Sequence, residues 1–192
     1  MAKNIDIQIP SFVFGLIDKY YERGSPSYRI LLTHSILVTR KALQVAERMK
    51  RLHPDIPFIL EASMLHDIGI CKTNAPGLGC HGKDPYITHI IHGRKMLEKE
   101  GYPKHGLVCE RHTGVGLPKA YIIKQGFPLP KRDMVPTTTE ERIVSYADSF
   151  YSKDPSCLFH EKSVEEIAAF LSQFGARFGK TFLRWAKEFG DA

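Results

Sequence analysis

Hydrophobic and polar residues alternate along most of this chain with the three- and four-residue spacing of amphipathic helices. The spacing is clearest from Tyr28 to Met49, where apolar positions recur between charged side chains. A second helix is predicted over Pro57–Ile70, with Pro57 at a favoured starting position. A third runs from Thr88 to Gly101, where the glycine and the proline two residues later indicate a helix end.

The second half of the chain continues the helical pattern after one long loop. A short helix is predicted over Lys104–Arg111, followed by a loop over Thr113–Pro136 that is rich in glycine and proline and holds one turn at Lys119–Lys124. The sequence Thr-Thr-Glu-Glu at 138–141 indicates a capping box, and Ser-Val-Glu-Glu at 163–166 indicates another. A last helix is predicted over Gly179–Phe189, and a strand pattern appears only at Ile5–Ile9. The expected fold is therefore all-α, an irregular helical bundle.

Composition narrows the class of protein only a little. The 192 residues, 43% of them hydrophobic, suit one globular domain. The N-terminal stretch lacks the pattern of a signal peptide, and no run approaches the roughly 20 apolar residues of a membrane span, so a cytoplasmic protein without membrane contact is expected. The four cysteines form no C-x-x-C pair and are read as reduced thiols.

The net charge of +6 suits an anionic substrate, although a basic surface is as often plain solvation. No basic run carries the interleaved aromatic residues that would indicate nucleic-acid binding. The charge would thus suit a small phosphorylated partner such as a nucleotide, but does not by itself select one. The aromatic positions Phe170, Phe174, Phe178, Phe182 and Trp185 repeat every three or four residues, which indicates a core stripe or a contact between two copies in a homodimer.

Six side chains able to bind a metal occur in segments that otherwise resemble buried helices. They are His34, His66, Asp67, His92, His112 and Asp148. A histidine or carboxylate on an apolar helix face is costly to bury unless something pairs with it, and a divalent ion is a common partner for several such groups. Adjacent helical residues point about 100° apart, so His66 can bind one ion while Asp67 reaches between two. Two metals about 3.5–4 Å apart suit phosphoryl transfer.

In their order along the chain, these residues resemble the HD-domain superfamily of metal-dependent phosphohydrolases, in its HDIG branch. The match covers about residues 28–151 and includes the segment LHDIG. It implies a single HD domain over 1–192, with an N-terminal helix and a C-terminal helical extension. By this resemblance one metal takes His34, His66, Asp67 and Asp148, and a second takes Asp67, His92 and His112. Segments such as ERHTGVGL are also similar to a small, mainly prokaryotic HDIG subfamily. Lys72 lies two places beyond the usual lysine of the motif.

Two positions leave alternatives open. His89 competes with His92, because residues three apart share a helix face, but the following Gly93 and the family pattern favour His92. The segment Gly77–Asp84 nearly spells a phosphate-binding P-loop, but Asp84 stands where serine or threonine should be and no strand precedes it. We read this segment as a loop that covers the metal site.

The predicted function is hydrolysis of a phosphate ester, such as a nucleotide or cyclic nucleotide, by a metal-activated hydroxide at a dinuclear site. His66 and Asp67 are the expected catalytic centre, and Lys72 and Arg111 are chosen as phosphate-binding residues because they adjoin the motif. The cofactors are two divalent transition metal ions, chosen from Fe, Mn, Co, Ni and Zn. Two alternatives remain: a di-iron oxygenase with the same ligand set, and a regulatory module that binds a nucleotide without turnover.

Overall fold

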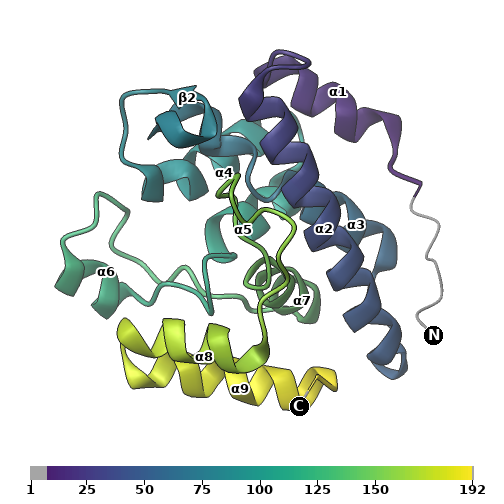
Figure 1. The fold of residues 1–192 in the computed structure, drawn as a ribbon, viewed down its shortest axis with the longest axis vertical. Helices are drawn as coiled ribbons and strands as arrows, with labels where there is room; N and C mark the ends of the chain where they lie inside the picture. Colours follow the sequence, from purple (N-terminus) through teal and green to yellow (C-terminus); the bar gives the residue numbers. More distant parts are fainter. Residues whose placement is uncertain (1–7, 192) are drawn as a thin grey trace.

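The computed structural model describes residues 8–191, and helices dominate this part of the chain (Figure 1). The α-helices are α1 (Ser11–Tyr20), α2 (Pro26–Arg48), α3 (Ile56–Leu65), α4 (His89–Lys99), α5 (Pro103–Arg111), α6 (Lys119–Gln125), α7 (Thr139–Asp148), α8 (Val164–Gln173) and α9 (Ala176–Phe189). Single 3₁₀ turns are η1 (Lys50–Leu52), η2 (Ile68–Lys72), η3 (Pro76–Leu78) and η4 (Tyr86–Thr88). The all-α prediction is confirmed. The strand predicted at Ile5–Ile9 begins outside the described residues.

Two short strands form a small hairpin beside the helices. Strand β1 (Asn74–Ala75) pairs antiparallel with β2 (Cys80–His81), with Asn74 opposite His81. The segment that resembles a P-loop, Gly77–Asp84, overlaps the turn and second strand of this hairpin and continues beyond it. No described helix is long and apolar enough to cross a membrane.

Most predicted helices are present, with shifted ends that have local causes. Ser25 caps α2 by accepting a hydrogen bond from the Tyr28 amide, and Asp55 caps α3 in the same way. The capping box at Ser163 is confirmed on both sides. At α7 only half of the predicted box forms: Thr138 accepts from the Glu141 amide, but the Glu141 carboxylate bonds to Thr137 and Arg111 instead.

The helix predicted over Pro57–Ile70 is interrupted, and this interruption matters for the site. Helix α3 ends at Leu65, His66 and Asp67 form the junction, and the chain continues as the 3₁₀ turn η2. The two residues are therefore not successive positions of one regular α-helix. Their side chains leave the backbone where the chain changes direction.

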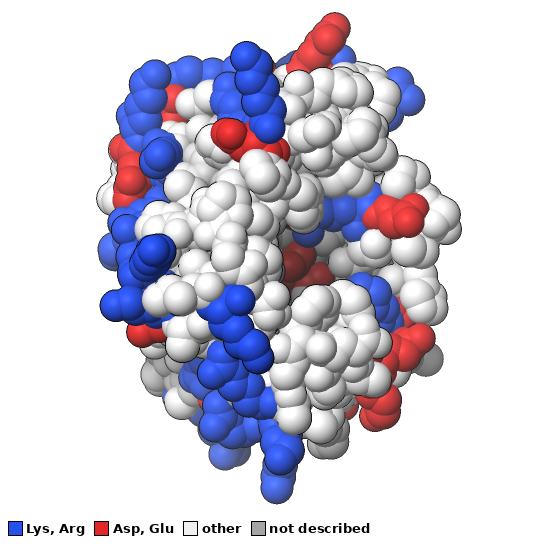
Figure 2. Space-filling model, turned by 90° about the vertical axis from the view of Figure 1, so that its left-hand side faces the viewer, with Lys and Arg blue, Asp and Glu red and all other residues white. Residues whose placement is uncertain are grey.

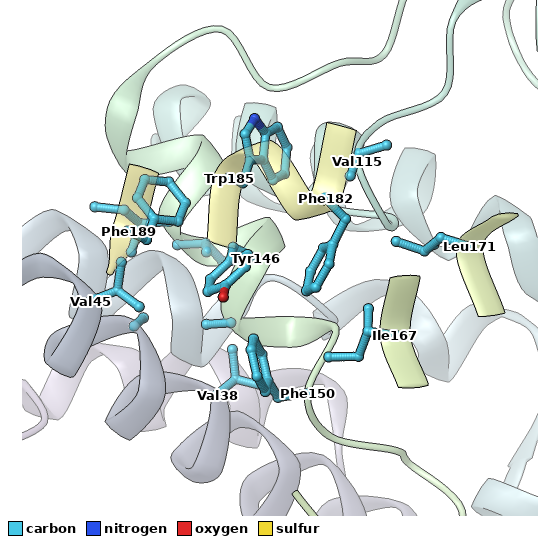
Figure 3. Packing of buried hydrophobic residues seen from close by; sticks show 14 of the residues in the cluster. Val38, Val45, Val115, Tyr146, Phe150, Ile167, Leu171, Phe182, Trp185 and Phe189 are labelled. Atoms are coloured by element: carbon cyan, nitrogen blue, oxygen red, sulfur yellow. The ribbon is translucent and has the colours of Figure 1, made fainter. Parts of the chain in front are cut away.

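The buried hydrophobic residues form two clusters. One lies around α2, α7, α8 and α9 and includes Tyr146, Phe182 and Trp185, whose packing is shown in Figure 3. The other lies around α1, η2 and the C-terminal part of α4. Along α2, Leu31 belongs to the second cluster and Val38 to the first, so His34 lies where the two clusters meet.

The aromatic series at the C-terminus belongs to two helices rather than one. Helix α8 ends before Gly175, whose φ of 143° favours glycine, and α9 then packs back against α8 (Figure 1). Phe178, Phe182 and Trp185 are buried in the core, whereas Phe170 and Phe174 are exposed by 54% and 49%. The core interpretation therefore holds for only part of the series.

Candidate metal centre

Buried histidine and aspartate side chains converge from five helices or helix ends. One group consists of His34, His66, Asp67 and Asp148, and a second of Asp67, His89 and His112, with the ligand atoms of each group within 4.8 Å of one another. Asp67 belongs to both groups. The structure therefore arranges these side chains as two adjoining candidate metal sites that share one carboxylate.

Most of the candidate ligands lie at the ends of helices. His34 lies within α2, but Asp148 is the last residue of α7, His89 is the first of α4, and His112 directly follows α5. Their side chains meet His66 and Asp67 at the junction after α3. Each position is fixed by a packed helix, which is the rigid support that a metal site requires.

The two oxygen atoms of Asp67 face different groups of histidines. Oδ2 lies 3.1 Å from Nε2 of His66 and 3.4 Å from Nε2 of His34. Oδ1 lies 3.3 Å from Nε2 of His89 and 3.4 Å from Nε2 of His112. Such a carboxylate has the placement needed to bridge two cations, one at each oxygen.

Asp148 completes the group on the Oδ2 side. Its Oδ1 lies 2.9 Å from Nε2 of His34 and 3.3 Å from Nε2 of His66. The two imidazole Nε2 atoms are themselves only 3.3 Å apart. Four potential ligand atoms thus surround one small volume.

The backbone fixes the tautomers of three histidines. Nδ1 of His66 lies 2.6 Å from the Ser63 carbonyl, and the corresponding distances are 2.7 Å for His89 and 2.8 Å for His112. In each case Nδ1–H donates to the carbonyl three residues earlier, which leaves a lone pair on Nε2 in the neutral ring. This arrangement of an anchored Nδ1 and a free Nε2 is typical of metal-binding histidines.

These residues fit a metal for a second, independent reason. Oδ2 of Asp67 is paired with the ammonium of Lys153 at 2.7 Å, whereas the fully buried Oδ1 has no hydrogen-bond partner among residues 8–191. The neutral ring of His89, 3.3 Å from Oδ1, presents a lone pair on Nε2 and not a donor, and an unpaired buried carboxylate oxygen is costly. A cation between the lone pairs and the carboxylates satisfies both sets of atoms at once.

The electrostatics also favour a cation. Burial alone would raise the pKa of Asp67, but Lys153 and His66 hold that pKa well below its usual range. Burial opposes protonation of His66, yet the Asp67 and Asp148 carboxylates raise its pKa to about 10. Burial lowers the pKa of His89 to about 3, and Asp67 offsets only part of this effect. The carboxylates are thus ionised, and His89 is a neutral ring able to bind a metal.

The structure corrects the expectation for His92. Its side chain is 26% exposed, and its Nε2 bonds to the surface carboxylate of Asp84 at 2.8 Å. His89 takes its place in the second group. Gly93 does mark the face of α4 that packs on η2, but the residue one turn before it on that face is His89. Gly93 therefore indicates His89, and not its neighbour His92.

The two predicted phosphate-binding residues lie apart from the cluster. Lys72 is exposed, with its ammonium 5.9 Å from the ring centre of Tyr20. Arg111 is held by the carboxylate of Glu141 at 2.8 Å and by Thr137. Among the described contacts, neither side chain reaches a candidate ligand, so adjacency in sequence did not translate into adjacency in space.

The residue that sequence reasoning missed is Lys153. Its ammonium lies 2.7 Å from Oδ2 of Asp67 and 3.4 Å from Oδ1 of Asp148. Burial would lower the pKa of this lysine, but the two carboxylates hold it well above the usual range. No sequence pattern marked it, because Lys153 lies in the irregular segment that follows α7.

A cavity of about 350 Å³ opens beside the candidate metal centre. Asp148 and Lys153 form part of its wall, so the cavity reaches the cluster directly. A smaller cavity is lined by His34, Asp67, Leu78 and Lys153. Leu78 comes from the glycine-rich segment, which therefore lies beside the site. Figure 2 shows a hollowed face with acidic atoms deep in the hollow and basic atoms near them.

The fold and the clustered ligands define the class of protein, and comparison with known families agrees. The family model for the HD domain matches residues 31–152. This chain belongs to the HD-domain family. A solved structure, the HD domain of the phosphodiesterase PgpH from L. monocytogenes, is similar with a TM-score of 0.52 and 18% identity, covering 91% of this chain and 85% of that one. At this identity the likeness shows the fold.

Curated relatives come from archaeal sources. An uncharacterized protein of Methanocaldococcus jannaschii is 32% identical over 153 residues, which cover 78% of both chains. Two proteins named tRNA (cytidine(56)-2'-O)-methyltransferase, from Thermoplasma volcanium and Picrophilus torridus, are 32% and 37% identical over 73% and 58% of this chain. The matches span only 36% and 29% of those longer proteins.

Proposed function

We propose that this protein is a metal-dependent phosphohydrolase that acts on a small phosphate ester. The observation that carries the proposal is the placement of Asp67, whose two buried oxygens each face a separate group of imidazole nitrogens. One divalent transition metal ion would be held by His34, His66, Asp67 and Asp148, and a second would be held by Asp67, His89 and His112. Imidazole and carboxylate ligands suit Fe, Mn, Co, Ni and Zn.

A bound pair of such ions supplies Lewis-acid stabilisation of phosphoryl oxygens and a lowered pKa for a coordinated water. The chain's own residues set the geometry. The carbonyls of Ser63, Tyr86 and Cys109 fix three imidazole rings, so these ligands need no reorientation. Such pre-organisation is the main contribution that a protein makes to this kind of site.

Lys153 has a second role in this proposal. Its ammonium contacts Asp67 and Asp148 and also lines the larger cavity. Cations at the two sites would compete with Lys153 for the carboxylate oxygens. The lysine would then turn toward the cavity, where its charge would bind and orient a substrate phosphate.

The test is phosphate release from a panel of phosphate esters with each of the five metals, for wild type and Asp67→Asn. The substitution preserves shape but removes the shared charge, and we expect hydrolysis to fall at least about 100-fold, as when ligand or electrostatic groups of such sites are lost. Asp84→Asn is the matched control, because Asp84 is an exposed carboxylate bonded to His92. Full activity in Asp67→Asn would contradict the proposal.

Two further measurements, oxygen uptake and thermal unfolding, separate the two alternative functions. Oxygen uptake by iron-loaded protein, without phosphate release, would indicate an oxygenase on this ligand set. A nucleotide that raises the melting temperature but is never consumed would indicate a regulatory binding module. Phosphate release that requires both the metal and Asp67 distinguishes the hydrolase from both.

A further inference from the structure

The cavity beside Asp148 changes character along its length. Near the candidate metal centre its wall contains the charged groups of Asp148 and Lys153, and Lys162 also lines it. Elsewhere the wall is apolar, formed by Ile167 and Leu171 of α8 together with several aromatic rings. A molecule with a charged end and an apolar end would match this division.

Aromatic rings dominate the apolar part. Tyr121 of α6 packs edge-on against Phe178 of α9 and Phe127, with ring centres 4.9 Å and 6.0 Å apart. Phe170 and Phe174 of α8 form another edge-on pair at 5.2 Å and also line the cavity. Aromatic walls of this kind favour a ring-shaped group, which can stack on a face or contact an edge.

The exposed rings of α8 indicate that a ligand completes this surface. Phe170 and Phe174 are 54% and 49% exposed although they line a cavity, and exposed apolar side chains gathered at one place commonly mark a binding site.

The size of the cavity limits the ligand. At about 350 Å³ it lies near the lower end of the roughly 300–1,000 Å³ range of small-molecule sites. It suits one or two fused rings rather than a long chain or a polymer. Most of its wall offers no partners for the several hydroxyl groups of a sugar, which would be costly to bury unpaired.

We infer that this cavity binds the organic group of the substrate, and that this group is an aromatic ring system. The phosphate would lie at the Asp148 and Lys153 end and the ring among the side chains of α6, α8 and α9. This inference rests on the proposed function for the position of the phosphate. It adds that organic phosphates with aromatic groups are preferred over sugar phosphates and glycerol phosphates.

Binding can be tested without turnover. The probe is (naphthalen-1-ylmethyl)phosphonate, whose carbon–phosphorus bond is not hydrolysed as an ester, with methylphosphonate as the probe that lacks a ring. Calorimetric titration of metal-loaded protein should give a Kd for the naphthyl probe at least about tenfold lower than for methylphosphonate, as expected when a ring is buried. Equal Kd values for the two probes would overturn the inference.

Variants at the mouth of the cavity locate the ring. Phe174→Glu is chosen because the side chain is half exposed, and Leu183→Glu on α9 is the matched control, since Leu183 is 45% exposed and does not line the cavity. We expect Phe174→Glu to raise the Kd of the naphthyl probe about tenfold and leave that of methylphosphonate unchanged. Leu183→Glu should change neither value.

The outcomes separate this inference from the proposed function. If the naphthyl probe binds tightly and Phe174→Glu weakens this binding, but no ester is hydrolysed, the inferred ring site is supported and the proposed hydrolase function is wrong. If many esters are hydrolysed and kcat/KM is equal for aryl and glycerol phosphates, the proposed hydrolase function is supported and the inferred ring site is wrong. If Phe174→Glu instead converted a dimer to a monomer with unchanged probe binding, the exposed rings would be a contact between two copies and the inference would be wrong.

Discussion

Gly69 lies directly against the first turn of helix α4 at His89. A Cβ atom on Gly69 would lie 2.1 Å from the His89 carbonyl oxygen and 2.3 Å from the Gly93 amide nitrogen. No side chain fits at this distance. The glycine of the HDIG segment is therefore required by the close packing of η2 on α4, and this packing brings His89 to Asp67.

Gly69→Ala should consequently move α4 away from η2. We expect a loss of about 1–3 kcal/mol in the free energy of unfolding, because the clash is with backbone rather than with a flexible side chain. The bound metal should also fall, since His89 moves with the helix. Denaturant unfolding and elemental analysis measure the two effects. Gly15→Ala in α1 is the control, because nothing lies within 4 Å of its Cβ and alanine favours a helix. Equal stability of the two variants would contradict this explanation.

Lys153 should matter most when the metal is absent. Without metal its ammonium neutralises Asp67 and Asp148, so Lys153→Met should lower the free energy of unfolding by about 3–5 kcal/mol in the presence of a chelator. Saturating metal should restore much of this loss, because cations replace the missing charge and bind only the folded state.

Thermal unfolding with chelator and with Mn²⁺ tests this prediction. The variant should gain more from the metal than wild type does, and Lys153→Arg, which keeps the charge, should behave more like wild type. A loss of the same size in both conditions would show that Lys153 acts only through packing.

The capping box of α8 supports the wall of the larger cavity. Ser163 accepts from the Glu166 amide, and the Glu166 carboxylate accepts from the Ser163 amide at 2.6 Å. Ser163→Ala should cost about 1 kcal/mol of stability. Because α8 carries no candidate metal ligand, metal content should stay at the wild-type value while chemical unfolding shifts to lower denaturant. Loss of metal in this variant would indicate a coupling that the contacts do not explain.

Most of the candidate ligands could be predicted from the sequence, because burying a polar group on an apolar helix face costs free energy unless the group is paired. The structure brings five of these predicted residues together, namely His34, His66, Asp67, His112 and Asp148. Helix periodicity gives the direction of a side chain within a helix, so these positions could be recognised before their helices were placed.

The errors came from relationships between elements. The periodic pattern could not show that the chain turns at His66 and Asp67, because the apolar residues continue through the 3₁₀ segment η2. Choosing between His89 and His92 required knowing which face of α4 meets η2. Lys153 lies in a loop without periodicity, and only the folded chain shows that it reaches the carboxylates.

The most direct test of this account is the metal content per chain of His89→Ala beside His92→Ala and wild type, for protein purified without chelator. The two histidines lie on the same helix three residues apart, but only His89 faces Asp67. We predict about two metal ions per chain in wild type and His92→Ala, and about one in His89→Ala. Loss of metal in His92→Ala with full content in His89→Ala would contradict the arrangement of the site described above.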